Sequence, residues 1–234
     1  MPYYLYNIDF YFVALVVPAM IFSLVMQIMV KGAYKKQSKV RNARGLTGAE
    51  AAQRVLSHYG VQGVRIEMTQ GTLSDHYDPR TNVIRLSQGV YSTPSVAAVG
   101  IAAHEAGHAA QHAEKYAPIK VRNAILPVCR FGSTLSMPLI LIGFWIGLYP
   151  VGHFLVTIGL TLFAAVAVFQ LVTLPVEFNA SKRALQVIDQ QGLLEGSDYA
   201  GAKKVLTAAA MTYVAALIVS IANLLRLLAR TRRR

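Results

Sequence analysis

Long apolar runs separated by short polar segments are the main pattern of this chain. Residues 9–30 contain a single charge, Asp9, at their start. A helix of this length crosses about 30 Å of hydrocarbon, and Pro18 in its middle is tolerated in a transmembrane helix. No lysine or arginine precedes the run and no A-x-A site follows it, so a cleaved signal peptide is disfavoured. We predict an N-terminal transmembrane anchor over residues 1–30.

The later apolar runs predict further membrane segments. Residues 135–149 and 153–174 form a transmembrane hairpin over 135–174 in this interpretation, and residues 118–132 form an amphipathic segment near the cytoplasmic surface. The last run, 205–225, is also long enough to span. A crossing there would place the terminal arginines outside, against the positive-inside rule. Two alternatives therefore stay open for residues 205–234, a fourth crossing or a helix packed against the inner leaflet.

Basic residues predict how the chain is oriented in the membrane. Six of them follow the first apolar run, namely Lys31, Lys35, Lys36, Lys39, Arg41 and Arg44. The positive-inside rule then puts the N-terminus outside and residues 31–134 in the cytoplasm. Residues 175–204, which carry further lysines, return to the cytoplasm after the hairpin.

The polar segment after the anchor predicts a small α+β unit. Residues 45–59 are expected to form a helix that Thr47 caps, with Glu50 three residues later as in a capping box. Residues 64–68 and 82–86 alternate like half-buried strands, and residues 71–80 between them have turn chemistry. A small sheet of this kind would give an extended peptide an edge to pair with.

Composition narrows the class of protein. Hydrophobic residues make up 54% of the chain and charged residues 15%, which fits a membrane protein. The net charge of +12 suggests nucleic acid as a partner. The basic residues lie beside apolar runs, however, and no RNA-binding motif or recognition helix accompanies them, so we predict lipid contact and no nucleic acid. Cys129 is the single cysteine, which excludes intrachain disulfides and cysteine-based zinc sites.

The motif with the clearest chemistry is H-E-x-x-H at residues 104–108. Two histidines four residues apart lie on one face of a helix, so His104 and His108 can bind one metal ion. Glu105 is turned about 100° from His104, where it can act as general base on a metal-bound water. Zinc-assisted peptide hydrolysis needs this combination. The alternative is a helix that contains these three residues by chance and binds no metal.

The flanking residues favour a helix over 95–114. Ser92 and Thr93 offer hydroxyl caps, and Pro94 suits the first helical turn. Gly107 weakens the helix by about 0.5–1 kcal/mol relative to alanine. A glycine inside the motif could let another element approach the metal closely.

A catalytic zinc usually has three protein ligands, and the chain has few candidates for the third. His112 lies on the same face, but a straight helix cannot wrap three histidines round one ion. Glu114 stands where metzincins have a third histidine, yet their helix-breaking glycine is replaced by Gln111. Glu177 follows Pro175, and we favour it as the ligand at the start of a second helix. Its alternative role is to stabilise that helix dipole by about 0.3–1 kcal/mol.

Three stretches resemble a known family. Residues 74–80, 102–111 and 174–185 are similar to the bacterial YugP-like membrane zinc metallopeptidases. The resemblance implies a gluzincin-type zinc peptidase with Glu177 as third ligand and one Zn²⁺ per chain, in the bacterial inner membrane. HtpX-type and prenyl-protein proteases are more loosely similar, and Ser181 stands where they have an aspartate.

The sequence thus predicts a mainly α, polytopic membrane protein with a small α+β, gluzincin-like catalytic unit at the cytoplasmic face. Its expected function is zinc-dependent hydrolysis of protein or peptide substrates, and the alternative is a catalytically silent zinc-binding scaffold. A stabiliser of the oxyanion or a partner of the ligands is also expected. The candidates for these roles are His76, Tyr77, His112, Ser181 and Tyr213.

Overall fold

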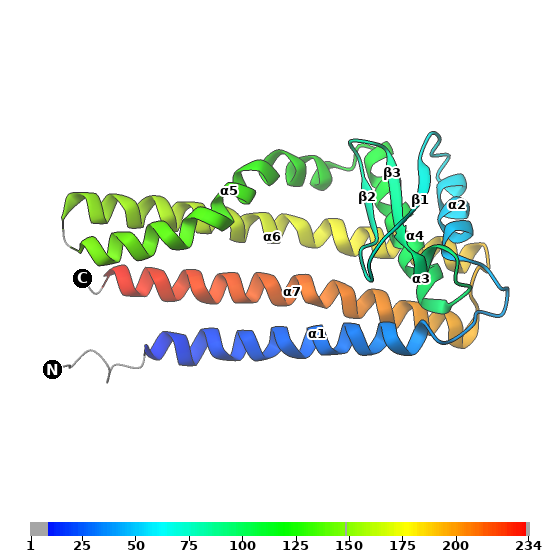
Figure 1. Ribbon diagram of the computed structural model, residues 1–234, viewed down its shortest axis with the longest axis horizontal. Helices are drawn as coiled ribbons and strands as arrows, with labels where there is room; N and C mark the ends of the chain where they lie inside the picture. The colour runs from blue at the N-terminus through cyan, green and yellow to red at the C-terminus, as the bar shows by residue number, and fades with distance from the viewer. Residues whose placement is uncertain (1–8, 148, 233–234) are drawn as a thin grey trace. The chain divides into compact units, whose positions relative to one another are not determined.

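The computed structural model describes residues 9–147 and 149–232, and most of them are helical (Figure 1). In chain order the elements are the π-helical turn η1 (Phe12–Val16), α1 (Val17–Gln37), α2 (Gly48–His58), β1 (Arg65–Thr69), β2 (His76–Asp78), β3 (Val83–Ser87), α3 (Gln88–Tyr91), α4 (Val96–Ala113), α5 (Ala117–Ile146), α6 (Pro150–Gln190) and α7 (Gly196–Arg232). Residues 1–8 of the predicted anchor and residues 233–234 of the basic tail lie outside the described residues.

The chain divides into two compact units. The first unit comprises residues 1–25, 120–174 and 213–234, and the second comprises residues 26–119 and 175–212. Among the residues that the structure describes, four helices are long and apolar enough to cross a membrane, and these are Phe12–Gln37, Ala117–Ile146, Pro150–Gln190 and Gly196–Thr231. Large apolar side chains stay exposed along the first unit, such as Trp145 at 88% and Phe131 at 70%. Exposed apolar surface of this extent is expected where lipid covers it.

In the first unit, α5 is one helix where the sequence suggested a surface segment followed by a separate span. Pro127 and Pro138 lie inside it, and the helix bends along its length (Figure 1). Glycines allow α5 and α6 to pack closely, because a Cβ added at Gly143 would lie 2.7 Å from the Gly152 carbonyl oxygen. Small residues permit this close approach of membrane helices.

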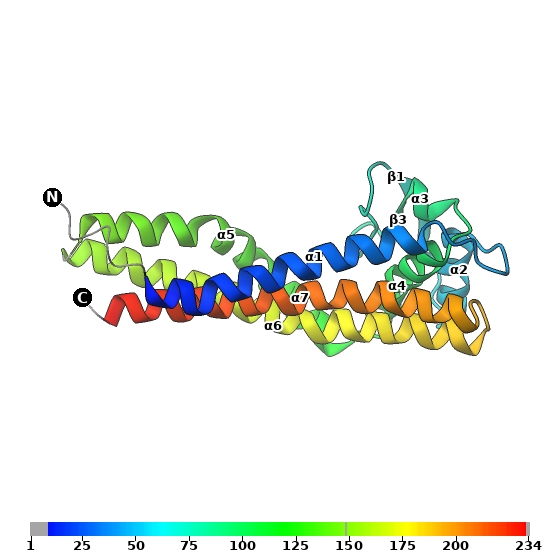
Figure 2. The ribbon, with the colours of Figure 1, turned by 90° about the horizontal axis from the view of Figure 1, so that it is seen from below.

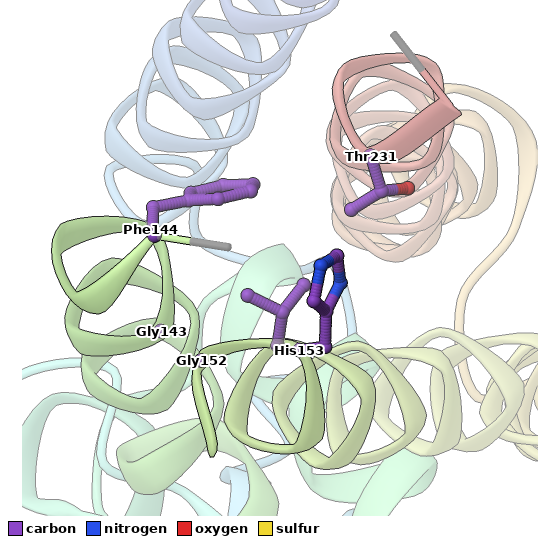
Figure 3. Close-up of a pocket in the computed structure, with 7 residues that line it drawn as sticks. Gly143, Phe144, Gly152, His153 and Thr231 are labelled. Carbon is purple, nitrogen blue, oxygen red and sulfur yellow. The ribbon is translucent and has the colours of Figure 1, made fainter. Parts of the chain in front are cut away.

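Figure 3 shows a small cavity in the first unit, with Phe144, His153 and Thr231 around it. Its volume of about 20 Å³ is room for a single water molecule. The cavity is therefore a packing feature of this helix end and is too small to be a ligand site.

An ion pair joins the beginning and the end of the first unit. The Nε–H of Arg226 on α7 donates to Oδ2 of Asp9 over 2.6 Å, and its guanidinium lies 4.7 Å from the Phe12 ring centroid. Asp9 therefore offsets part of the charge at the C-terminal end of α7. No sequence pattern predicts that these two residues meet.

The second unit contains the sheet and most of the buried core. The strand order is β1-β3-β2, with β1 parallel and β2 antiparallel to β3. The predicted helix near residues 45–59 is confirmed as α2, and its capping box is present because Thr47 accepts from the Glu50 amide while Glu50 accepts from the Thr47 amide. β2 lies in the segment predicted as a turn. That prediction was wrong because the three residues are held by pairing with β3, which local sequence does not encode.

Helix α4 lies against α6 within the second unit (Figures 1 and 2). Its N-cap is Ser95, whose Oγ accepts from the Ala98 amide over 3.1 Å, so the expected cap at Ser92 or Thr93 was wrong by two to three residues. Pro94 precedes this cap. The expectation that a new helix starts after Pro175 was also wrong, because α6 continues through this proline. Apolar helices tolerate an interior proline when neighbouring groups compensate for the lost hydrogen bond.

Candidate metal centre

Two helices bring three potential metal ligands together in the second unit. His104 and His108 lie one turn apart on α4, with ring centroids 4.6 Å from each other. Glu177 comes from α6, and its Oε2 lies 3.4 Å from Nε2 of His104 and 3.5 Å from Nε2 of His108. Among the residues that the structure describes, these three form the one group of histidine, cysteine or acidic side chains that could hold a metal ion.

The two distances from Oε2 of Glu177 fit a tetrahedral zinc site, and all three candidate ligand atoms lie within 4.8 Å of one another. Zinc–nitrogen and zinc–oxygen bonds of about 2.0–2.2 Å at tetrahedral angles place neighbouring ligand atoms about 3.4 Å apart. Oε2 of Glu177 is buried and has no hydrogen-bond partner in the described part of the chain. An unpaired buried carboxylate oxygen is costly, and a cation between the three side chains would remove that cost.

The other nitrogen of each histidine bonds to a neutral side chain. Nδ1 of His104 lies 3.0 Å from Oγ of Ser181, and Nδ1 of His108 lies 3.1 Å from Oε1 of Gln111. A proton on each Nδ1 leaves the lone pair of Nε2 facing Glu177. Such outer partners orient ligand histidines in metal sites. Ser181 therefore takes the position of an orienting group for His104.

Gln111 is a residue whose role the sequence interpretation missed. It is fully buried, and its Nε2 donates to the Val176 carbonyl over 2.8 Å and to Oδ1 of Asn179 over 2.9 Å. These two bonds fix Oε1 as the group that faces His108. Its position three residues after His108 on one helix could have indicated this contact. The sequence interpretation used Gln111 only to argue against the metzincin pattern, which has a glycine at this position.

The network extends from Asn179 to the C-terminal end of α4. Arg183 donates to Oδ1 of Asn179 over 2.8 Å and contacts Oε2 of Glu114 at 2.7 Å. The Arg183 hydrogen bond lowers the pKa of the Glu114 carboxyl group below its ordinary value. Glu114 thus anchors α4 to α6, and it does not belong to the ligand cluster.

The sheet contacts the acidic residue of the motif. Oε2 of Glu105 accepts a hydrogen bond from the backbone amide of Tyr77 in β2 over 2.9 Å. Glu105 is 9% exposed, and one carboxylate oxygen remains for another partner. The Tyr77 hydroxyl donates to Oδ1 of Asn82 over 2.8 Å, so this phenol is already used within the sheet.

The remaining candidates differ in their placement. His76 is exposed, and its Nδ1 lies 2.8 Å from the Ser74 carbonyl oxygen. His112 is exposed on α4, with its ring edge-to-face against Tyr77 at 6.0 Å between centroids. It does not belong to the group of possible metal ligands found among the described residues. Tyr213 belongs to the first unit, and the structure does not relate it to the cluster.

The cluster attracts positive charge. Burial of His108 disfavours its charged form, but the adjacent carboxylate of Glu177 and the charge of Glu105 favour it, and together they raise the pKa of His108. Two acidic groups beside two imidazoles thus create a negative potential at this point. A divalent cation would satisfy the same potential without protonating the histidines.

Gly107 makes the approach of α6 to α4 possible. A Cβ added at Gly107 would lie 2.7 Å from the carbonyl oxygen of Ala180, a backbone atom that cannot rotate away. We expect Gly107→Ala to lower stability by about 1–2 kcal/mol, because overpacking costs about 1–3 kcal/mol and outweighs the 0.5–1 kcal/mol gained in helix propensity. Thermal unfolding in detergent measures this loss.

Gly32 offers a matched control. It also lies inside a helix, α1, and nothing comes within 4 Å of a Cβ built on it. Gly32→Ala should therefore leave stability unchanged or raise it. Equal thermal midpoints for the Gly107→Ala and Gly32→Ala variants would show that the close contact between α4 and α6 is not present in solution.

Comparisons with known proteins agree with this chemistry. Residues 12–232 match the family model described as "Putative neutral zinc metallopeptidase". The chain is also 45% identical over 215 residues to "Putative membrane protease YugP" of Bacillus subtilis (strain 168), which covers 92% of this chain and 94% of that protein. No solved structure matches the chain.

Proposed function

The chain belongs to the neutral zinc metallopeptidase family, and on that premise we propose that it is a membrane-anchored zinc endopeptidase of the gluzincin type. The observation that supports the proposal best is the convergence of His104, His108 and Glu177 at distances that suit one zinc ion. Zinc bound there would polarise a peptide carbonyl and lower the pKa of its bound water toward about 7.

The residues around the cluster have separate roles in this proposal. His104, His108 and Glu177 hold the ion, while Ser181 and Gln111 keep the two imidazoles in the required tautomer. Glu105 accepts the proton of the attacking water and delivers it to the amine nitrogen that leaves when the C–N bond breaks. The Tyr77 amide holds Glu105 in place through its second carboxylate oxygen.

Removal of metal tests the proposal against a catalytically silent scaffold. The purified full-length protein should cleave an unfolded protein substrate, lose that activity with a zinc chelator and regain it when about one equivalent of zinc is restored. The reason is that water becomes a strong nucleophile near neutral pH only when a bound metal ion lowers its pKa. Cleavage that persists after complete removal of metal would contradict the zinc mechanism, and zinc binding without cleavage would favour the scaffold.

The membrane arrangement is a second part of the proposal. We place four crossings in the bacterial inner membrane, with the ligand cluster toward the cytoplasm and both termini outside. The contact between Arg226 and Asp9 supports a crossing by α7, because pairing lowers the cost of an arginine at the outer end of a span. It favours the fourth crossing over a helix that lies on the inner leaflet.

Reporter fusions at the C-terminus measure this topology. Alkaline phosphatase fused there should be active and green fluorescent protein should be dark, because both report an outside location. A fusion within the loop after α1, at Ser38, should give the opposite pair of signals and serves as the control. A fluorescent C-terminal fusion would contradict the fourth crossing.

A further inference from the structure

The second unit has an open groove between α6 and α7 that the peptidase chemistry does not use. Its volume is about 330 Å³, within the range of small-molecule pockets. Four apolar side chains form part of its wall, and these are Phe178, Leu185, Leu206 and Ala210. We call it the α6–α7 groove.

Two lysines border the α6–α7 groove from opposite helices. Lys182 on α6 and Lys203 on α7 both line it and both are exposed. Within the part of the chain that the structure describes, neither ammonium group takes part in an ion pair with an acidic side chain. Asp189 is the one acidic residue among the lining residues. The groove therefore combines an apolar wall with an excess of positive charge.

Apolar residues and lysines follow one another along each helix in an order that suits a ligand with an apolar chain and a charged head. On α6 the lining begins at Phe178, shortly after the apolar run that ends at Leu174, and Lys182 follows one turn later. On α7 the lining passes from Lys203 to Ala210, which is already inside the apolar run. On each helix an apolar lining residue, Phe178 or Ala210, therefore lies nearer the predicted membrane span than the lysine does, while Leu185 and Tyr199 lie beyond the lysines.

We propose that the α6–α7 groove binds an anionic phospholipid. The acyl chain would lie against Phe178 and Ala210, and the phosphate between the ammonium groups of Lys182 and Lys203. Basic pockets beside membrane helices recognise anionic headgroups in this way. A purely acidic peptide would satisfy the lysines but would leave the apolar wall exposed to water, so the lipid is the better fit.

The groove also adjoins the candidate metal centre. Ser181 lines it, and the same Oγ atom contacts Nδ1 of His104 at 3.0 Å. A bound acyl chain would exclude water from this hydroxyl group. With water excluded, the Ser181 hydroxyl would keep its hydrogen bond to His104.

Lipid titration of the purified full chain in neutral detergent tests the proposal. Dioctanoyl phosphatidylglycerol should bind more tightly than dioctanoyl phosphatidylcholine, as measured by calorimetry. Each lysine near a lipid headgroup contributes about fivefold in affinity, so Lys182→Gln with Lys203→Gln should weaken phosphatidylglycerol binding by about 25-fold. Lys204→Gln, an exposed neighbour outside the lining, is the matched control and should change it by less than about twofold.

A variant that keeps the charges provides an independent check. Thr207 lines the groove and is exposed, so Thr207→Trp should fill the groove and weaken phosphatidylglycerol binding by about tenfold or more. The proposal is overturned if phosphatidylcholine binds equally well, if the double lysine variant keeps its affinity, or if Lys204→Gln has the same effect. Tighter binding of an acidic peptide than of the lipid would also overturn it. The assay needs no turnover, so its outcome is independent of the peptidase proposal.

Discussion

Glu105→Gln is expected to slow peptide hydrolysis by about 10²–10⁴-fold, the usual contribution of a general base, while the protein still binds about one zinc per chain. Glutamine has nearly the same shape and can still accept a hydrogen bond from the Tyr77 amide. It cannot take up a proton from the attacking water. Because residue 105 lies outside the ligand cluster of the described chain, zinc binding should be unaffected. The measurements are kcat/KM and zinc content on the same preparation.

Glu67→Gln is a suitable control for that experiment. Glu67 lies on β1, where it contacts Arg65 at 3.1 Å and its side chain is 41% exposed. The same chemical change at this position should leave both activity and zinc content unchanged. Full activity of the Glu105→Gln protein would end the proposed mechanism. Loss of zinc from that protein would reassign Glu105 as a ligand.

Glu177→Gln is expected to weaken zinc binding by more than about 100-fold. Loss of an orienting partner outside the coordination shell typically costs about 10–100-fold, and loss of a charged ligand should cost more. The carboxylate is 2% exposed and faces both imidazoles, and among the described residues no other acid belongs to this group of possible ligands. Competition with a chromogenic chelator measures the affinity, and peptide hydrolysis should fall in parallel.

Two variants make the result at Glu177 interpretable. Glu195→Gln removes an exposed acid that pairs with Arg44, and its zinc affinity should equal that of the wild type. His104→Ala should lose zinc to a similar extent as Glu177→Gln, because both remove one of three ligands. A Glu177→Gln protein with unchanged zinc affinity, beside a zinc-free His104→Ala protein, would mean that the third ligand is another group.

Features encoded by local spacing were predictable from the sequence. The H-E-x-x-H spacing placed His104 and His108 on one face of α4, and Thr47 with Glu50 marked the start of α2. Glu177 was found by elimination among few acidic residues and from a family resemblance. Gly107 was singled out as a point of close approach, and its short distance to Ala180 agrees with that interpretation.

Features that depend on long-range contacts were not predictable. β2 consists of three residues in a turn-rich segment, and it is held by β3 and by the bond from Tyr77 to Glu105. The continuation of α6 through Pro175 depends on its neighbours, which a local rule for proline ignores. Asp9 and Arg226 are 217 positions apart in the chain, and no pattern in either segment indicated their contact.

Anomalous diffraction at the zinc edge, from crystals of the zinc-loaded full-length protein, tests the central claim most directly. We predict one anomalous peak per chain, about 2.0–2.2 Å from Nε2 of His104, Nε2 of His108 and Oε2 of Glu177. A peak bound to the two histidines with the Glu177 carboxylate outside bonding distance, or a peak elsewhere in the chain, would contradict the account.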